Sequence, residues 1–158
     1  QWDMGALAFD YTELRFTIKV PDDVVSFSYD FAFFSTEWPE YFGSMYNDLY
    51  VGWLESEQWT GNISFDSMGN PITLNAVFFE YLNQGGTVAP ELDGTCMNLH
   101  GGTNWLQSTA PVTPGEEITV VFAIFDLSDN ILDSYVFLDN FQWGCVPTNR
   151  PETVPPAG

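Results

Sequence analysis

Hydrophobic and polar residues alternate with a period of two along much of this chain. Residues 12–20 place a polar or charged side chain between each pair of apolar ones, the apolar set being Leu14, Phe16, Ile18 and Val20. Residues 25–34 repeat the pattern, and the turn-forming sequence Pro-Asp-Asp at 21–23 separates the two segments. Because successive side chains of a strand point to opposite faces, both segments are predicted to be strands with one buried face.

The same pattern extends to most of the remaining sequence. Further strands are predicted at 48–54, 61–65, 71–79, 117–126 and 134–143, with turns at 68–71 and 85–86. No amphipathic helix and no internal repeat stands out. Many short strands with frequent turns are typical of an all-β, antiparallel β-sandwich, and we expect a jelly roll.

Domain organisation follows from length and a change in composition. With 158 residues the chain is expected to form a single sandwich domain over 1–146. Residues 147–158 are rich in proline and have little to bury, so they are predicted to form an extended linker. Since the chain starts at Gln1 without a methionine, we expect a processed piece of a longer protein.

Charge is the most unusual feature of the composition. Asp and Glu number 22, Lys and Arg only 3, and the net charge is −19. Such a surface repels phosphate backbones and anionic lipids, which argues against nucleic-acid and membrane-surface roles, and it attracts cations. Adaptation to salty surroundings is the alternative explanation. No apolar run approaches the roughly 18 residues needed for membrane insertion.

Two segments, 31–50 and 125–140, gather hard oxygen donors among aromatic residues. The candidate metal ligands are Glu37, Glu40, Asn47, Asp48, Asp126, Asp133 and Asp139. Calcium takes six to eight such oxygens, so it is the expected cofactor, with magnesium the second choice. A calcium loop of the EF-hand type starting at Asp126 fails, because Ile131 occupies the glycine position. We therefore expect both segments to share one ion.

Asp139 is central to that expectation. In strict alternation it lies on the same face as Tyr135, Phe137, Phe141 and Trp143. A carboxylate on an apolar face requires a cation or strong hydrogen bonds. The alternatives are a β-bulge that reverses the alternation, or backbone N–H groups that satisfy the carboxylate.

The two cysteines, Cys96 and Cys145, form no metal-binding or redox motif. A disulfide between them, and hence an oxidising compartment, is predicted over two unpaired buried thiols. Closing this loop of about 50 residues would stabilise the fold by roughly 4 kcal/mol in the chain-entropy model.

The segment FAFFSTEWPEYFGSMYNDLYVGWL, residues 31–54, resembles the signature of choice-of-anchor L domains. The matching positions are Ser35, Glu37, Pro39, Glu40, Tyr41, Asn47 and Asp48. The stretch from Asp126 to Leu138 and the Asp-Gly-Thr at 93–95 resemble further family motifs, whereas Thr36 replaces a common acid. The resemblance implies a secreted or surface-displayed bacterial β-sandwich joined to varied C-terminal anchors, without a defined activity.

Binding is predicted rather than catalysis. The chain has no nucleophile-elbow motif, its one histidine is His100, and no carboxylate pair matches a jelly-roll glycosidase. The expected function is a monomeric, calcium-dependent adhesion or ligand-binding module for an extracellular peptide, protein or glycan. One alternative is a carbohydrate-binding module that uses exposed aromatic rings, with Trp38, Tyr41, Trp59 and Trp105 as candidates. Another is a structural spacer that calcium stabilises.

Overall fold

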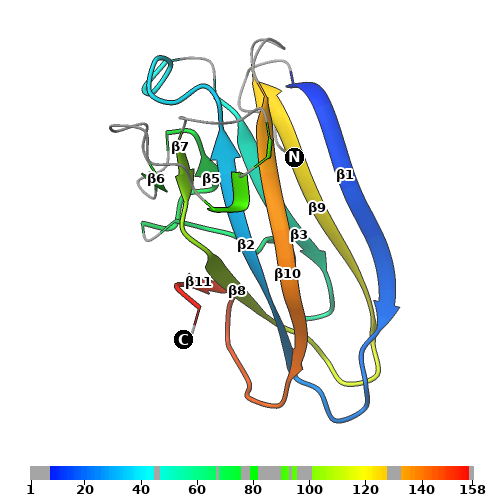
Figure 1. Cartoon of the computed structure of the whole chain (residues 1–158). Coiled ribbons are helices and arrows are strands. Elements are labelled where there is room, and N and C mark those ends of the chain that lie inside the picture. The colour runs from blue at the N-terminus through cyan, green and yellow to red at the C-terminus, as the bar shows by residue number, and fades with distance from the viewer. Residues whose placement is uncertain are drawn as a thin grey trace.

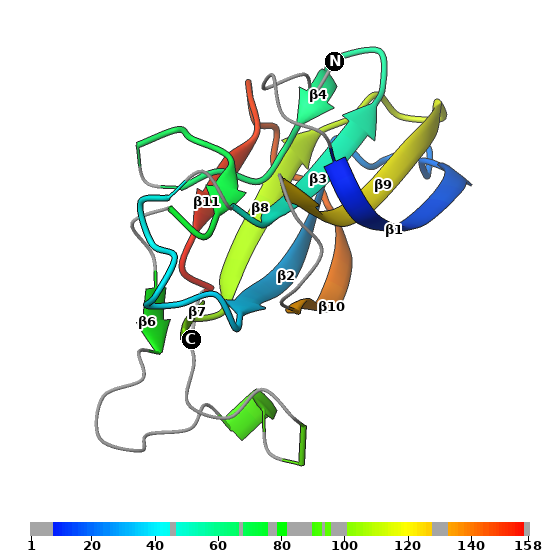
Figure 2. The same ribbon diagram turned by 90° about the horizontal axis from the view of Figure 1, so that it is seen from above.

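Two antiparallel β-sheets pack face to face in the computed structural model of this chain (Figures 1 and 2). The structure describes residues 8–44, 47–66, 68–75, 79–81, 90–92, 94–95, 101–127 and 133–156. This arrangement confirms the predicted all-β sandwich. The sheet orders do not establish jelly-roll connectivity, which stays a prediction.

The first sheet has the strand order β1-β9-β3-β4, and β5 pairs with the start of β3. Its strands are β1 (Ala8–Lys19), β9 (Glu117–Leu127), β3 (Leu49–Glu55), β4 (Thr60–Asn62) and β5 (Ile72–Thr73). β1 and β9 pair over almost their whole length, apart from a bulge between Phe9 and Thr12. The long strands thus correspond to the strongest alternating segments of the sequence.

The second sheet is built around β2, which pairs with β10 along one edge and with β8 and then β7 along the other. Its strands are β2 (Ser26–Ser35), β10 (Ser134–Gly144), β8 (Leu106–Pro111), β7 (Gly101–Thr103), β6 (Phe79–Tyr81) and β11 (Glu152–Val154). A short 3-10 helix, η1 (Pro90–Leu92), adds Leu92 to an apolar cluster that also contains Ala32 and Phe34.

Aromatic side chains from the alternating segments fill the space between the sheets. Phe27, Tyr29, Phe31 and Phe33 of β2 are all at most 1% exposed. The Tyr29 ring lies 4.7 Å from that of Phe122. Edge-to-face aromatic pairs of this kind contribute about 0.5–1.5 kcal/mol beyond the area they bury. The core therefore follows directly from the period-two pattern.

A β-bulge in β10 reverses the alternation on which the interpretation of Asp139 depended. Asp139 is opposite Asp30 and Gln142 is opposite Ser28, so β10 has one residue more than β2 between these pairs. The bulge contains Asn140, whose φ is +55°. Phe141 packs on Phe27 on the inner side, while Asp139 is exposed on the outer face. The prediction that Asp139 lies on the apolar face is wrong.

The C-terminal segment is also more than the predicted linker. β11 pairs with β8, Pro151 is buried, and Thr153 Oγ1 accepts a hydrogen bond of 3.0 Å from the Phe65 backbone N–H. The prediction of a linker over 147–158 is wrong for residues 151–154, because β8 offers them an open strand edge. No strand was predicted at β7 or β8 either. Within the described segments, no helix is long and apolar enough to cross a membrane.

Candidate functional site

Five strand termini meet at one end of the sandwich, at the top of Figure 1. They are the ends of β2 and β9 and the beginnings of β1, β3 and β10. Leu49 pairs with Phe125, so Asp48, just before β3, lies next to Asp126, near the end of β9. The sheet register therefore joins the two acidic segments, as the sequence predicted, through Asp48 and Asp126.

The carboxyl groups of Asp48 and Asp126 hydrogen-bond to each other in a buried position. Asp48 is 1% exposed and Asp126 is 6% exposed. Asp48 Oδ2 accepts a hydrogen bond of 3.1 Å from Ser35 Oγ and another from Ser134 Oγ. Ser35 and Ser134 are directly opposite each other on β2 and β10 of the second sheet, whereas Asp48 precedes β3 of the first sheet. The Asp48 carboxylate therefore links the two sheets.

Burial and the neighbouring acids change the ionisation of Asp126. Desolvation raises the pKa of Asp126 to about 8, and Asp48 adds to the rise through its charge and its hydrogen bond. The charges of Asp10 and Glu37 act in the same direction. At neutral pH and without a cation, the pair therefore retains a proton, since two ionised carboxylates in contact repel each other.

Glu37 and Asp10 approach this pair from two other segments. Glu37 is 1% exposed, and its backbone N–H donates a 3.1 Å hydrogen bond to Ser35 Oγ. Asp10 lies in the β1 bulge, opposite the end of β9, with φ at +47°. A left-handed backbone at an aspartate is uncommon, and bulges re-aim side chains near functional sites.

Three of the predicted ligands come together here, namely Glu37, Asp48 and Asp126. Sequence reasoning missed Asp10, Ser35 and Ser134, because a positive φ and a cross-strand pairing leave no mark in the period-two pattern. Within the described ranges, no group of three or more acidic, histidine or cysteine side chains is tight enough to cage a metal by itself. Calcium would thus need water or backbone oxygens besides these carboxylates.

The other predicted ligands lie apart from the carboxylate pair. Glu40 and Asp133 are exposed, and the backbone of Asp133 bonds to Thr36. Asn47 Oδ1 accepts a 3.3 Å hydrogen bond from the Asn75 backbone N–H. Asp139 lies in the middle of β10, opposite Asp30. Each residue of a strand adds about 3.3 Å, so Asp139 lies far along β10 from Ser134, the residue that contacts Asp48. The prediction that one calcium binds all seven residues is therefore wrong for Asp139.

The four predicted ligand-binding aromatics do not share one surface. Trp38 and Tyr41 lie in the loop after β2, where the Trp38 ring is 4.7 Å from that of Phe42. Trp59 lines a cavity of about 500 Å³ beside the C-terminal segment. Trp105 donates a 2.8 Å hydrogen bond to Glu91 Oε1 near η1. A sugar-binding platform made of all four is not formed.

Cys145 is exposed just after β10. Its predicted partner Cys96 lies outside the described residues, as does His100. The disulfide stays a prediction.

Comparison with protein families matches residues 3–142 to the choice-of-anchor L domain. The chain belongs to the choice-of-anchor L domain family. Membership indicates a secreted or surface-displayed bacterial module of a larger protein. Comparisons with curated proteins and with solved structures found no match. The match covers every strand except β11 and the last residues of β10, and it includes the whole acidic strand end.

Proposed function

We propose that this choice-of-anchor L domain is a calcium-dependent ligand-binding or adhesion module, and that calcium binds at the acidic strand ends. The buried contact between Asp48 and Asp126 carries the proposal. Two carboxylates in contact need a proton or a cation between them. Two of the three basic residues, Arg15 and Arg150, pair with Glu13 and Glu152 instead. A calcium ion would provide the missing charge.

Asp48, Asp126 and Glu37 are the residues that would hold the ion. All three are buried and offer the hard oxygen atoms that calcium prefers. Ser35 and Ser134 fix the orientation of the Asp48 carboxylate by donating to Oδ2. Asp10 adds negative charge from β1. The bound ion would cross-link strands of both sheets at this end.

Calcium would affect binding through the loop after β2. Glu37 and Asp48 stand at the two ends of this loop, so an ion held by both would fix where the loop leaves and re-enters the sandwich. The loop displays Tyr41 and Phe42, which are 40% and 50% exposed. Exposed aromatic side chains are frequent anchors of protein interfaces. The ligand would be an extracellular peptide, protein or glycan that contacts these rings. We propose binding without catalysis, by a monomeric domain.

A second candidate function, a structural spacer stabilised by calcium, is favoured by the burial of the three carboxylates. Glu37, Asp48 and Asp126 are at most 6% exposed, which favours an ion enclosed by the protein over one that bridges to a ligand. In that case calcium would stabilise a structural spacer without affecting recognition. Tyr41 and Phe42 distinguish the two candidates, because only a recognition module requires them.

Thermal unfolding and binding arrays together test the proposal. Calcium at 100 times its dissociation constant should stabilise the domain by about 2.7 kcal/mol relative to EDTA. A glycan array and a peptide array, each probed in calcium and in EDTA, should show at least one ligand whose binding is abolished by EDTA and weakened by Tyr41→Ala with Phe42→Ala. Stabilisation without any calcium-dependent binding would support the spacer. A melting curve unchanged by calcium would contradict both candidates.

A further inference from the structure

The outer face of the first sheet carries apolar side chains where water-facing polar residues would be expected. Val121, Ala123 and Phe125 of β9 and Val51 of β3 belong to a cluster on the side of this sheet away from the main core. Each is at most 6% exposed. Trp53 packs at the margin of the cluster. These buried apolar side chains line the base of a hollow on this face.

A hollow of about 220 Å³ opens on this face, and side chains of three adjacent strands line it. Tyr11 of β1, Trp53 of β3 and Phe125 of β9 supply aromatic walls. The Tyr11 ring lies 5.9 Å from that of Phe125 and is 54% exposed. Arg15 and Glu55 supply charged groups at the rim. Aromatic walls with a few polar groups are typical of ligand sites.

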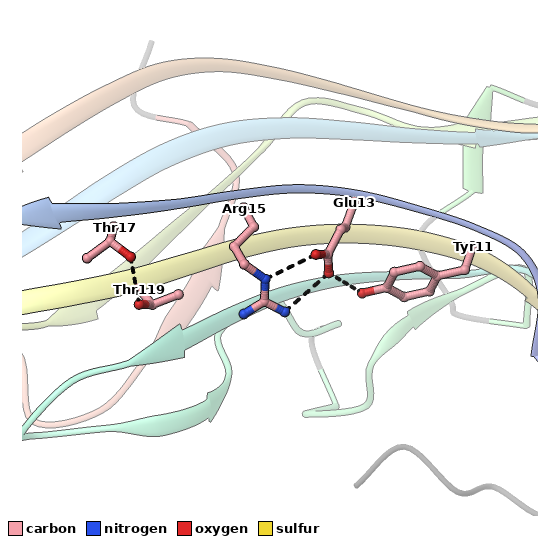
Figure 3. Close-up of polar contacts among 5 residues, drawn as sticks. All are labelled: Tyr11, Glu13, Arg15, Thr17 and Thr119. Atoms are coloured by element: carbon pink, nitrogen blue, oxygen red, sulfur yellow. Dashed lines mark hydrogen bonds and ion pairs between the residues drawn. The ribbon is translucent and has the colours of Figure 1, made fainter.

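Glu13 holds two of these side chains in fixed positions, as Figure 3 shows. Its Oε2 accepts a 2.5 Å hydrogen bond from the Tyr11 hydroxyl, and Arg15 Nε donates to Oε1 at 3.0 Å. Arg15 Nη2 donates to Oε2 at 3.2 Å. These bonds organise the ring and the guanidinium before a ligand arrives, which reduces the entropy lost on binding.

The Arg15 side chain is 51% exposed, and its contacts with Glu13 leave one nitrogen, Nη1, unused. Nη1 donates to no residue in the described part of the chain, because Glu13 uses only Nε and Nη2. The two carboxylates of Glu13 and Glu55 outweigh the single guanidinium, within a domain of net charge −19. An anionic ligand would therefore be repelled, and a neutral one with hydroxyl groups would not.

We infer that this hollow binds a neutral saccharide. A pyranose ring combines an apolar C–H face with a rim of hydroxyl groups. The C–H face would lie against Tyr11 and Trp53, and the hydroxyls would accept from Arg15 Nη1 and donate to Glu55. The site is separate from the acidic strand ends and does not require calcium. None of its residues was singled out by the sequence as a binding residue.

Isothermal titration in EDTA with cellotetraose, mannotetraose and chitotetraose tests the inference, with polygalacturonate as the anionic counterpart. At least one neutral oligosaccharide should bind, and polygalacturonate should not. Tyr11→Ala should weaken binding about threefold to tenfold, the loss of one aromatic contact. Arg15→Gln should have a similar effect by removing the charged donor. Tyr135→Ala, at a tyrosine 40% exposed on the other sheet, is the matched control and should bind like the wild type.

Melting temperatures of the variants separate a binding defect from unfolding. Arg15→Gln changes an exposed side chain, so it should leave the fold intact even if Tyr11→Ala does not. Absence of binding to all three neutral oligosaccharides would overturn the inference, as would equal affinity of the wild type, Tyr11→Ala and Arg15→Gln. Because EDTA is present throughout, neither result bears on the calcium site.

Discussion

Two pairs of aspartates face each other across neighbouring strands of this domain, and their surroundings differ sharply. Asp48 and Asp126 lie between the sheets, buried and in contact. Asp30 and Asp139 are opposite each other on the outer face of the second sheet, where Asp139 is exposed. Side-chain amides donate hydrogen bonds to the outer pair: Asp30 accepts one from Gln107 and one from Asn140, each of 2.9 Å.

The comparison indicates that burial, more than proximity in the sequence, sets the cost of placing two carboxyl groups side by side. Asp139 is exposed to water and side-chain amides donate to Asp30, so the charges of this outer pair are screened. Asp48 and Asp126 are buried, and desolvation together with the charge of Asp48 raises the pKa of Asp126 to about 8. The buried pair is therefore the one at which we propose that a cation binds.

The largest expected effect is a difference in the free energy of unfolding when one aspartate of each pair is replaced by alanine. Asp48→Ala should lower the free energy of unfolding by about 2–4 kcal/mol, because it leaves the buried hydroxyl of Ser35 and the half-buried hydroxyl of Ser134 without their acceptor. Asp139→Ala should change it by about 0.5 kcal/mol or less. Urea unfolding of both variants measures this. Equal losses would show that the two pairs are alike in energy.

A second effect should appear in the pH dependence of stability without calcium. Asp126 retains its proton to about pH 8 in the folded state, whereas an unfolded aspartate ionises near pH 4. The folded form binds more protons in this window, so its stability should fall as the pH rises from about 4 to 8. The neighbouring charges of Asp48, Asp10 and Glu37 favour the same direction.

Asp126→Asn provides the control for that experiment, because its amide cannot titrate. Melting curves in EDTA at several pH values should show a steeper decline for the wild type than for this variant. Calcium should stabilise the wild type more at pH 8 than at pH 5, since the ion competes with the proton. Parallel curves for the two proteins would exclude Asp126 as the titrating group.

The smallest effect concerns the bulge that keeps Asp139 outside. Asn140 has a φ of +55° and donates to Asp30 Oδ2 at 2.9 Å. Asn140→Ala should destabilise the domain by about 1 kcal/mol, because alanine is disfavoured in the left-handed region. Asn140→Gly should lose less, since glycine adopts this conformation freely. If alanine were tolerated better than glycine, backbone conformation would not explain the bulge.

The period-two pattern was sufficient to predict the sandwich and its longest strands. That residues 37–48 and 126–139 converge was predicted from the number of oxygen ligands that calcium needs, and the register of β3 and β9 brings Asp48 beside Asp126. The period-two pattern failed at Asp139, where one extra residue at the Asn140 bulge exchanged the two faces. It also missed β8 and β11. β8 alternates polar with small residues, and β11 is a short strand that forms only because the edge of β8 is open.

Calcium titration of two nearly isosteric variants tests the central claim most directly. Asp126→Asn and Asp139→Asn each replace one carboxyl group by an amide, one in the buried pair and one in the outer pair, so the two variants have the same formal net charge. Isothermal titration with calcium should show binding to the wild type and to Asp139→Asn with equal affinity, and at least tenfold weaker binding to Asp126→Asn, the effect of about 1.4 kcal/mol. Equal calcium affinity in both variants would contradict a cation site at the Asp48–Asp126 pair.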